Sequence, residues 1–297
     1  DNVQLIEEMF AILLQCILDR GAGSNLPRES QAALIILRTL DRPDGQDAMD
    51  WVYDEGPDTL RVFTTNDFFP DGMPQEATGG YNAIHYDGLF DLEYQLRGLR
   101  GQQPEGYPET RFPSLVSDPR TPRIARSPNE ITMVGKSFFQ FGDGSAPGTG
   151  ANHGSVTPTG EGTIRIDNDC LHAPMSPNLL ERALEFTGDS TVKKIQDAVE
   201  NGAHRELGST IHDGVGIAIL RTSGVPERAA AGIAYGDTLH HRHRDLLDVQ
   251  LYAYERPFLT DLGYPQSWAS MSKWESHWAT HNTAWGTLDP SLGGNAG

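Results

Sequence analysis

Apolar residues recur at helical spacing along the N-terminal part of the chain. Residues 3–20 (VQLIEEMFAILLQCILDR) carry apolar side chains around most of a helical circumference and precede Gly21 and Gly23, a pattern that predicts a buried helix. The same spacing predicts further helices over residues 29–40, 46–54, 58–69, 81–100, 176–188 and 189–202. Between them, the Pro- and Arg-rich stretch 101–127 is predicted to be an extended loop.

After Gly208 the apolar pattern changes to alternation of apolar and polar residues. The segments with this pattern are GVGIAILRTSG (214–224), RAAAGIAYG (228–236) and LLDVQLYAYERPFLTDLGY (246–264). A period of two with short turns predicts antiparallel strands. Helices followed by a sheet indicate an α+β protein, with a helical domain over residues 1–205 and an antiparallel β-sheet domain over 206–297.

The composition argues against two classes of partner. The 297 residues carry a formal net charge of -18, whereas nucleic-acid binding needs clustered Lys and Arg. The longest nearly apolar run, residues 9–18, is too short to span a bilayer. Cys16 and Cys170 form no disulfide framework and no CxxC metal motif, and are expected to be ordinary buried thiols. Both ends of the chain read as unfinished, so we expect a fragment of a longer protein.

Histidines crowd the start of the last alternating segment, in the stretch HHRHRD. If this stretch is a strand, His241 and His243 point to one face and His240 points to the other. Asp261 and His281 follow later in the chain and, with His243, would make a two-histidine, one-carboxylate site of the type that zinc accepts. The long spacings between them also suit ordinary surface histidines, so both interpretations stay open.

Several short motifs in the chain carry a resemblance to a known family. In the alternating part they are, in order, GVGIAILR (214–221), HRHRDLL (241–247), DLGY (261–264) and HNT (281–283). The helical part adds SNLPRES (24–30) and DGMPQEATGGYNAIHYDGL (71–89). In these motifs the chain resembles the heparinase II/III-like polysaccharide lyases, a family that includes heparinases and oligoalginate lyases. It departs from the family pattern at Leu26, where a histidine is usual, and Tyr264 is only the nearest counterpart of a second active-site tyrosine.

The resemblance implies a partial α/α toroid followed by an antiparallel β-sheet or β-sandwich domain, apparently truncated. It also implies an enzyme that cleaves an anionic polysaccharide containing uronic acid, such as alginate or the glycosaminoglycan heparan sulfate, by β-elimination. A periplasmic or secreted location goes with such a substrate. The C5 proton of a uronate is only weakly acidic while the adjacent carboxylate is charged, so preorganised donors must hold that carboxylate and the developing enolate.

Under this resemblance, individual residues acquire roles in the elimination. Asn25 would donate to the substrate carboxylate, although by residue type alone it could cap the helix that follows. Tyr81 would be the general acid toward the leaving oxygen and, in a syn elimination, also the base. Because a phenol has a reference pKa of about 10, base duty requires nearby donors or positive charge. His241 would be the base for the opposite epimer or a donor to the carboxylate. Glu76, Arg242 and Tyr264 complete the predicted substrate-binding set.

The same resemblance makes His243, Asp261 and His281 the metal ligands of the sheet domain. A structural zinc there would fix the strand that presents His241. Arginines could supply the local basic patch that a polyuronate needs, or be solvated surface charges. The candidates are Arg242 and Arg244 beside the histidines, and Arg120, Arg123 and Arg126 in DPRTPRIARSP.

Two rival functions stay open at the level of sequence. A glycoside hydrolase on an α/α toroid would need two carboxylates across a cleft, for which Glu76 with Asp71 or Asp87 are candidates. A non-catalytic, metal-stabilised carbohydrate-binding protein would leave Tyr81 and Asn25 without a purpose.

Overall fold

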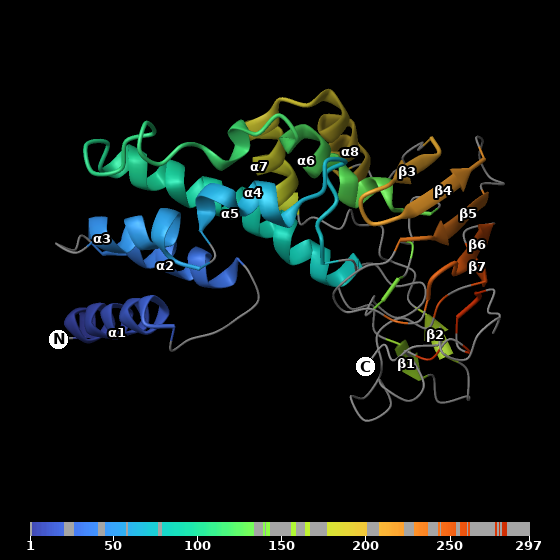
Figure 1. The fold of residues 1–297 in the computed structure, drawn as a ribbon, viewed down its shortest axis with the longest axis horizontal. Helices are drawn as coiled ribbons and strands as arrows, with labels where there is room; N and C mark the ends of the chain where they lie inside the picture. The colour runs from blue at the N-terminus through green and yellow to red at the C-terminus, as the bar shows by residue number, and fades with distance from the viewer. Residues whose placement is uncertain are drawn as a thin grey trace, which may run out of the picture. The chain divides into compact units, whose positions relative to one another are not determined.

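In the computed structural model the chain forms two compact units. The helical unit comprises Asp1–Glu76, Gly80–Ile131 and Leu171–Arg205, and the sheet unit comprises Ala77–Gly79, Thr132–Cys170 and Glu206–Gly297 (Figure 1). Within them the structure describes residues 2–20, 27–40, 45–57, 59–76, 79–133, 139, 141–142, 156–158, 164–166, 177–200, 208–222, 229–236, 243, 245–253, 256–259, 261, 277, 279 and 281–283.

Helices account for most of the helical unit, as the apolar spacing predicts. They are α1 (Asn2–Leu18), α2 (Arg28–Thr39), α3 (Gly45–Asp50), α4 (Leu60–Asp67), α5 (Gly79–Gln102), α6 (Thr121–Glu130), α7 (Pro177–Thr187) and α8 (Ser190–Glu200). A π-helical turn covers Trp51–Glu55 and a 3₁₀ turn covers Leu115–Ser117. Every predicted helix is present, with ends that differ by a few residues.

The prediction of a loop over residues 101–127 is wrong at its end, because α6 begins at Thr121. Pro122 sits in the first turn, where a helix has no need of its missing N–H. Pro128 lies inside the helix and cannot donate to the carbonyl of Ile124, but the hydroxyl of Ser127 donates to that oxygen instead, at 3.1 Å. Two prolines within ten residues favour a loop in a prediction from sequence, but at these two positions both are compatible with a helix.

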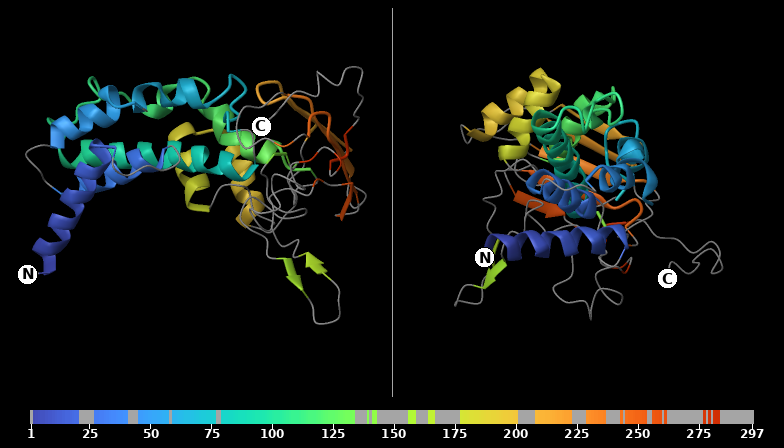
Figure 2. Two further views of the ribbon diagram at one scale, coloured as in Figure 1. Left: turned by 60° about the horizontal axis from the view of Figure 1, so that its bottom comes forward. Right: turned by 90° about the vertical axis from the view of Figure 1, so that its left-hand side faces the viewer.

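The long helix α5 runs the length of the helical unit (Figures 1 and 2) and supplies much of its core. Leu89, Leu92, Leu96 and Leu99 recur at three- and four-residue intervals and are all buried. Full burial of one leucine side chain contributes roughly 1.5–3 kcal/mol. This row of leucines fixes which face of α5 points inward and therefore where its remaining side chains lie.

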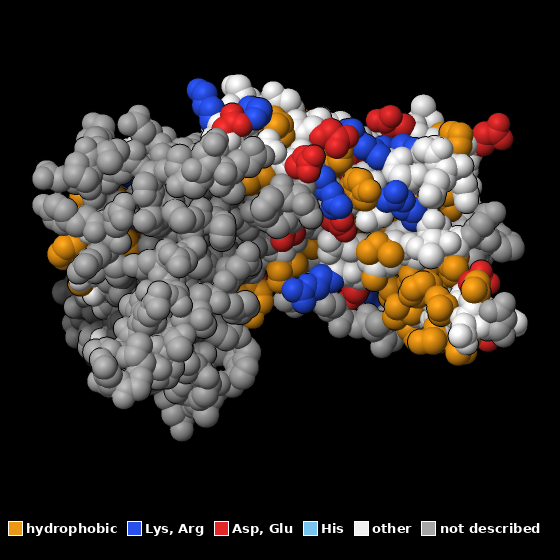
Figure 3. All heavy atoms as spheres, turned by 180° about the vertical axis from the view of Figure 1, so that it is seen from behind, with side chains coloured by type: hydrophobic (Ala, Val, Ile, Leu, Met, Phe, Trp, Pro, Cys, Tyr) orange, Lys and Arg blue, Asp and Glu red, His pale blue; other side chains and the backbone are white. Residues whose placement is uncertain are grey.

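Helix α1 differs from the prediction of a buried helix. Only Leu14 and Ile17 are buried in it, through packing against α2, while Met9 and Ile12 are 61% and 65% exposed. Apolar side chains gather over α1 in the view of Figure 3. Cys16 on the same helix is also exposed, so the expectation of a buried thiol is wrong there, and Cys170 lies outside the described residues.

The sheet unit contains the antiparallel strands that the alternation predicts. The five strands pair in chain order and are β3 (Thr210–His212), β4 (Ile217–Arg221), β5 (Ala229–Ala234), β6 (Val249–Ala253) and β7 (Arg256–Leu259). A separate two-stranded ribbon joins β1 (Val156–Pro158) to β2 (Ile164–Ile166) (Figure 2).

The two faces of the five-stranded sheet differ in burial. Ile219 on β4, Ala230 on β5 and Tyr252 on β6 are buried on one face, where Phe139 packs so tightly that a Cβ at Gly232 would lie 2.3 Å from its ring. Side chains of the other parity point to the opposite face, where Leu220 and Leu251 are exposed and the others are half-buried. The buried face anchors β6, and the segment that carries His243 leads into this strand.

Candidate functional site

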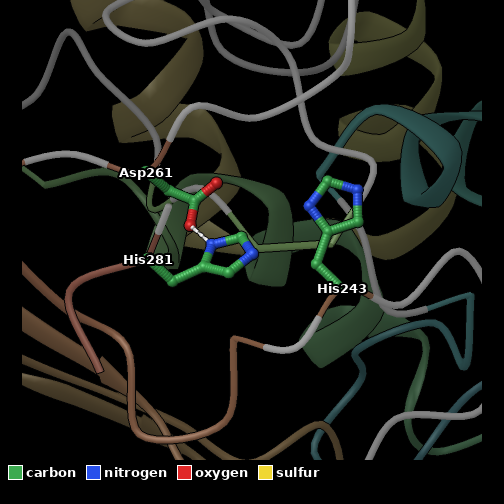
Figure 4. Close-up of side chains that lie close together, drawn as sticks. All are labelled: His243, Asp261 and His281. Carbon is green, nitrogen blue, oxygen red and sulfur yellow. Dashed lines mark hydrogen bonds and ion pairs between the residues drawn. The ribbon is translucent and has the colours of Figure 1, made fainter. Parts of the chain in front are cut away.

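Three residues from separate segments of the sheet unit meet in a buried group, the candidate metal centre (Figure 4). His243 precedes β6, Asp261 follows β7, and His281 lies in a later segment. One ligand atom from each lies within 4.8 Å of the other two. The exposed fractions are 2% for His243, 0% for Asp261 and 8% for His281, so all three side chains lie away from bulk water.

The contacts of His281 leave one of its two ring nitrogens available for a cation. Nδ1 of His281 forms a short hydrogen bond with Oδ2 of Asp261, drawn as the dashed line in Figure 4. Nε2 of His281 is buried and has no hydrogen-bond partner among the described residues. Such an orphaned nitrogen is what a metal ligand looks like before the cation is added.

The residue types and spacing of the candidate metal centre fit zinc. Two imidazoles and one carboxylate are a common zinc ligand set. Tetrahedral zinc with bonds of about 2.1 Å places its ligand atoms about 3.4 Å apart, so the group has to contract around the ion. For Nε2 of His281 and Asp261 to bind the same ion, the carboxylate would have to turn from Nδ1 of His281 toward the ion, because Nδ1 of a histidine bound through Nε2 points away from the metal.

Buried acids around the centre give His281 an unusual electrostatic environment. Burial alone would lower the pKa of His281, but the hydrogen bond to Asp261 and the charges of Asp261, Asp245 and Asp248 together raise the pKa above its ordinary value. Burial raises the pKa of Asp248 to about 6, helped by the charge of Asp261. A divalent cation at the centre would offset this concentration of negative charge.

His243 does not lie on a strand, contrary to the sequence-based expectation for HRHRDLL. The chain turns instead at Leu246 and Leu247, where the N–H of Asp248 donates to the carbonyl of Asp245 at 2.8 Å. Leu247 takes a positive φ of 63°. This turn delivers the chain into β6, and His243 precedes it in an irregular segment. His240 and His241 lie outside the described residues, so their predicted orientations stay predictions.

Sequence reasoning missed a set of residues behind the candidate metal centre. Asp248 accepts hydrogen bonds from the N–H of Asn282 and from Nε2 of Gln250, both at 2.7 Å. Oδ2 of Asp245 accepts the N–H of Gly142 at 2.6 Å. Asp245 and Asp248 lie so close in sequence to His243 that they could have indicated a charged cluster. Their partners Gly142 and Asn282, however, lie far away in the sequence.

A second polar group lies in the helical unit around Glu76. Nε2 of His85 lies 3.8 Å from Oε2 of Glu76, and Nδ1 lies 3.7 Å from Oδ1 of Asp67. The ring of His85 stacks on Phe63 with 6.3 Å between ring centroids. Tyr81 is half-buried in the first part of α5, one helical turn before His85. His85 and Asp67 were missed, although the four-residue spacing from Tyr81 pointed to His85.

Several predicted site residues lie outside the part of the chain that the structure describes. They are Asn25, His241, Arg242, Arg244 and Tyr264. Helix α2 begins at Arg28 with Pro27 in the cap position, and both interpretations of Asn25 stay predictions.

The arginines of the α6 region are engaged in structural contacts. The guanidinium of Arg120 donates to the carbonyls of Phe68 and Thr64, at 2.9 and 2.8 Å, and binds the carboxylate of Asp118. Arg126 donates to Asp189 at 3.2 Å. These contacts do not favour the basic patch that the sequence suggested for them.

Solved structures share this architecture. A crystal structure of heparinase III superposes with a TM-score of 0.65 and 14% identity, covering 91% of this chain and 40% of the heparinase chain. The BT4657 gene product, also a heparinase III, gives a TM-score of 0.58 and 13% identity, covering 88% of this chain and 37% of that one. The chain has the fold of heparinase III. No protein-family model matches the sequence, and no curated protein matches it in sequence.

The heparinase III fold confirms the α+β prediction of a partial helical toroid followed by an antiparallel sheet. It also supports, at the level of fold, the resemblance carried by the motifs. The chain spans about two fifths of the length of heparinase III, at 40% of that chain. Among the described residues, no helix is long and apolar enough to cross a membrane.

Proposed function

We propose that this chain is part of a polysaccharide lyase that cleaves a uronic-acid-containing polymer by β-elimination. The observation that carries the proposal is the meeting of His243, Asp261 and His281 in a chain with the heparinase III fold. These are the residues that the order of the motifs assigned to the metal centre. Since the structural neighbours are heparinases, a glycosaminoglycan such as heparan sulfate is the first substrate class to test, with alginate second. A periplasmic or secreted location belongs to the same proposal.

The elimination breaks the C5–H bond and the C4–O bond and forms a C4=C5 double bond. In the proposed mechanism Asn25 donates to the uronate carboxylate and stabilises the charge that develops as the C5 proton leaves. Tyr81 gives its proton to the leaving oxygen at C4, and His241 or the Tyr81 phenolate takes the C5 proton. Arg242, Tyr264 and Glu76 bind the sugar units around the scissile bond.

The surroundings of Glu76 support its place in this mechanism. Its carboxylate faces His85, which itself faces Asp67 at the end of α4, so Glu76 is held in the turn that leads to α5. Tyr81 lies in the first turn of that helix and is half-buried. A phenol at such a position can reach solvent on one side while the helix holds its backbone.

Zinc is the proposed cofactor, bound by His243, Asp261 and His281, and its contribution would be structural. When bound, it would link the segment before β6 with the segments that follow β7. Because His241 lies only two residues before His243, this link would also order the backbone that presents His241. The chain's own residues carry the proton transfers.

The test is the ultraviolet absorbance of C4=C5 unsaturated ends after incubation with heparan sulfate, alginate or a neutral glycan. We expect absorbance to rise with one uronate polymer and Tyr81→Phe to abolish the rise. Tyr94→Phe is the matched control, because Tyr94 lies on the same helix and is 38% exposed. Reducing ends without unsaturated ends would instead indicate a glycoside hydrolase using Glu76 with Asp71 or Asp87. Binding without either product would indicate a carbohydrate-binding protein.

A further inference from the structure

A buried carboxylate outside the candidate metal centre holds the segment that carries one of its histidines. Asp248, immediately before β6, has an exposed fraction of 0%. Its Oδ1 accepts the N–H of Asn282 at 2.7 Å, while the N–H of the next residue, Val249, donates to the carbonyl of Asn282 at 3.1 Å. Asn282 is thus held through both its N–H and its carbonyl by two consecutive residues.

These bonds act directly on His281. The N–H of Asn282 belongs to the peptide group that joins it to His281, so fixing that N–H fixes the plane of the peptide on the C-terminal side of the histidine. On the other side of this contact, the hydroxyl of Thr283 donates to the carbonyl of Leu246. The segment 281–283 therefore lies along the turn and the start of β6, and its histidine faces the centre.

A buried carboxylate at Asp248 is energetically unfavourable, and packing of the sheet alone would not require one. Burying an acid close to another buried acid is unfavourable unless nearby positive charge compensates, and Asp261 also has an exposed fraction of 0%. A carboxylate does, however, accept a backbone N–H more strongly than a neutral oxygen does. A cation in the neighbouring centre would stabilise the negative charge of Asp248 and thereby the charged form that accepts the N–H of Asn282.

We propose that Asp248 is a positioning residue of the metal centre: it holds His281 in the ligand position through the N–H of Asn282. The inference rests on the metal site of the proposed function, but not on the lyase reaction. Gln250, which donates to the second oxygen of Asp248 at 2.7 Å, fixes the orientation of the carboxylate.

The experiment measures zinc affinity of the full 297-residue chain by competition with a chromogenic chelator, without any polysaccharide. We expect Asp248→Ala to weaken zinc binding about 10- to 100-fold, the usual effect of losing an outer-shell partner. Asp248→Asn should lie between it and the wild type, because an amide oxygen can still accept the N–H of Asn282. His281→Ala should abolish tight binding.

A control separates positioning from general loss of stability. Ile219→Ala removes a buried side chain from β4 of the same sheet, touches none of these bonds, and should leave zinc affinity unchanged. The proposal is overturned if Asp248→Ala binds zinc as tightly as the wild type, if Ile219→Ala weakens binding equally, or if the wild type does not bind zinc. A failed lyase assay leaves each of these results readable, since none requires a substrate.

Discussion

His281 and Asp261 form a buried hydrogen-bonded pair although 20 positions separate them in the chain. Asp261 lies two residues after the end of β7, whereas His281 is held next to the start of β6 by its neighbour Asn282. Strands β6 and β7 pair antiparallel, so the end of β7 lies beside the start of β6. Residues just past the end of β7 and residues next to the start of β6 therefore come together at the same end of the strands. With His243, the pair forms the candidate metal centre.

Zinc should stabilise the sheet unit through this centre. At free zinc about 100 times the dissociation constant, binding to the native state alone contributes about 2.7 kcal/mol to the free energy of unfolding. We expect a chelator to lower the melting temperature of the wild-type chain, and His281→Ala to remove the difference between zinc and chelator. His277→Ala is the matched control, since this nearby histidine lies outside the group of three. Equal melting temperatures of the wild type with zinc and with chelator would contradict a zinc site.

The sequence predicted those helices and strands that the spacing of apolar residues within a single segment determines. The leucines of α5 recur at helical intervals and are buried, and in β5 buried residues alternate with half-buried ones, as the period of a strand requires. Helix α6 was missed because its two prolines suggest a loop, while burial of Ile124 against the rest of the helical unit favours a helix. That burial is a tertiary effect with no local signal.

The candidate metal centre was predictable only in part, because some of its contacts depend on tertiary packing that leaves no local signal in the sequence. The three residues that meet in it were predicted as ligands from the resemblance, whose motifs are visible in order along the chain. The Asp248–Asn282 hydrogen bond joins residues 34 positions apart and depends on where the segment 281–283 is laid against β6. The contact between His85 and Glu76 likewise depends on the path of the turn before α5.

Asp87 should make the helical unit less stable as pH rises. Burial raises its pKa from 3.8 to about 7, and the charge of Asp91 one helical turn later adds to the effect. Because the folded-state pKa is the higher one, the unfolded state loses its proton first, and stability falls between about pH 4 and pH 7. The shift sets an upper limit of about 4 kcal/mol on this loss.

We therefore expect Asp87→Asn to unfold at higher urea concentration than the wild type at pH 8, and at nearly the same concentration at pH 4. Asp91→Asn is the comparison, because Asp91 binds Arg182 at 2.6 Å and accepts from Gln31 at 3.2 Å. Removing that carboxylate should destabilise the unit at pH 8. An Asp87→Asn variant whose stability relative to wild type does not depend on pH would disprove the account.

Glu93 on α5 should be among the most important polar residues for stability of the helical unit. Its side chain is fully buried and accepts the N–H of Leu115 at 2.8 Å and the hydroxyl of Ser114 at 2.9 Å. Arg97 donates to the same carboxylate at 2.9 Å. One acid thus ties the 3₁₀ turn at Leu115–Ser117 to α5 and holds a cation of its own helix.

Glu93→Ala should lower the free energy of unfolding by about 3–5 kcal/mol, because it leaves the buried N–H of Leu115 without an acceptor and removes the buried acid that pairs with Arg97 and Arg100. Glu93→Gln keeps the shape and one acceptor oxygen, so it should cost less than the alanine variant. Glu181→Ala is the control, since this acid on α7 is exposed and its loss should change stability by less than about 0.5 kcal/mol. Urea titration followed by far-ultraviolet circular dichroism, which reports on the helices, measures all three. Equal midpoints for Glu93→Ala and Glu181→Ala would show that the bonds to Leu115 and Ser114 contribute nothing to holding the turn against α5.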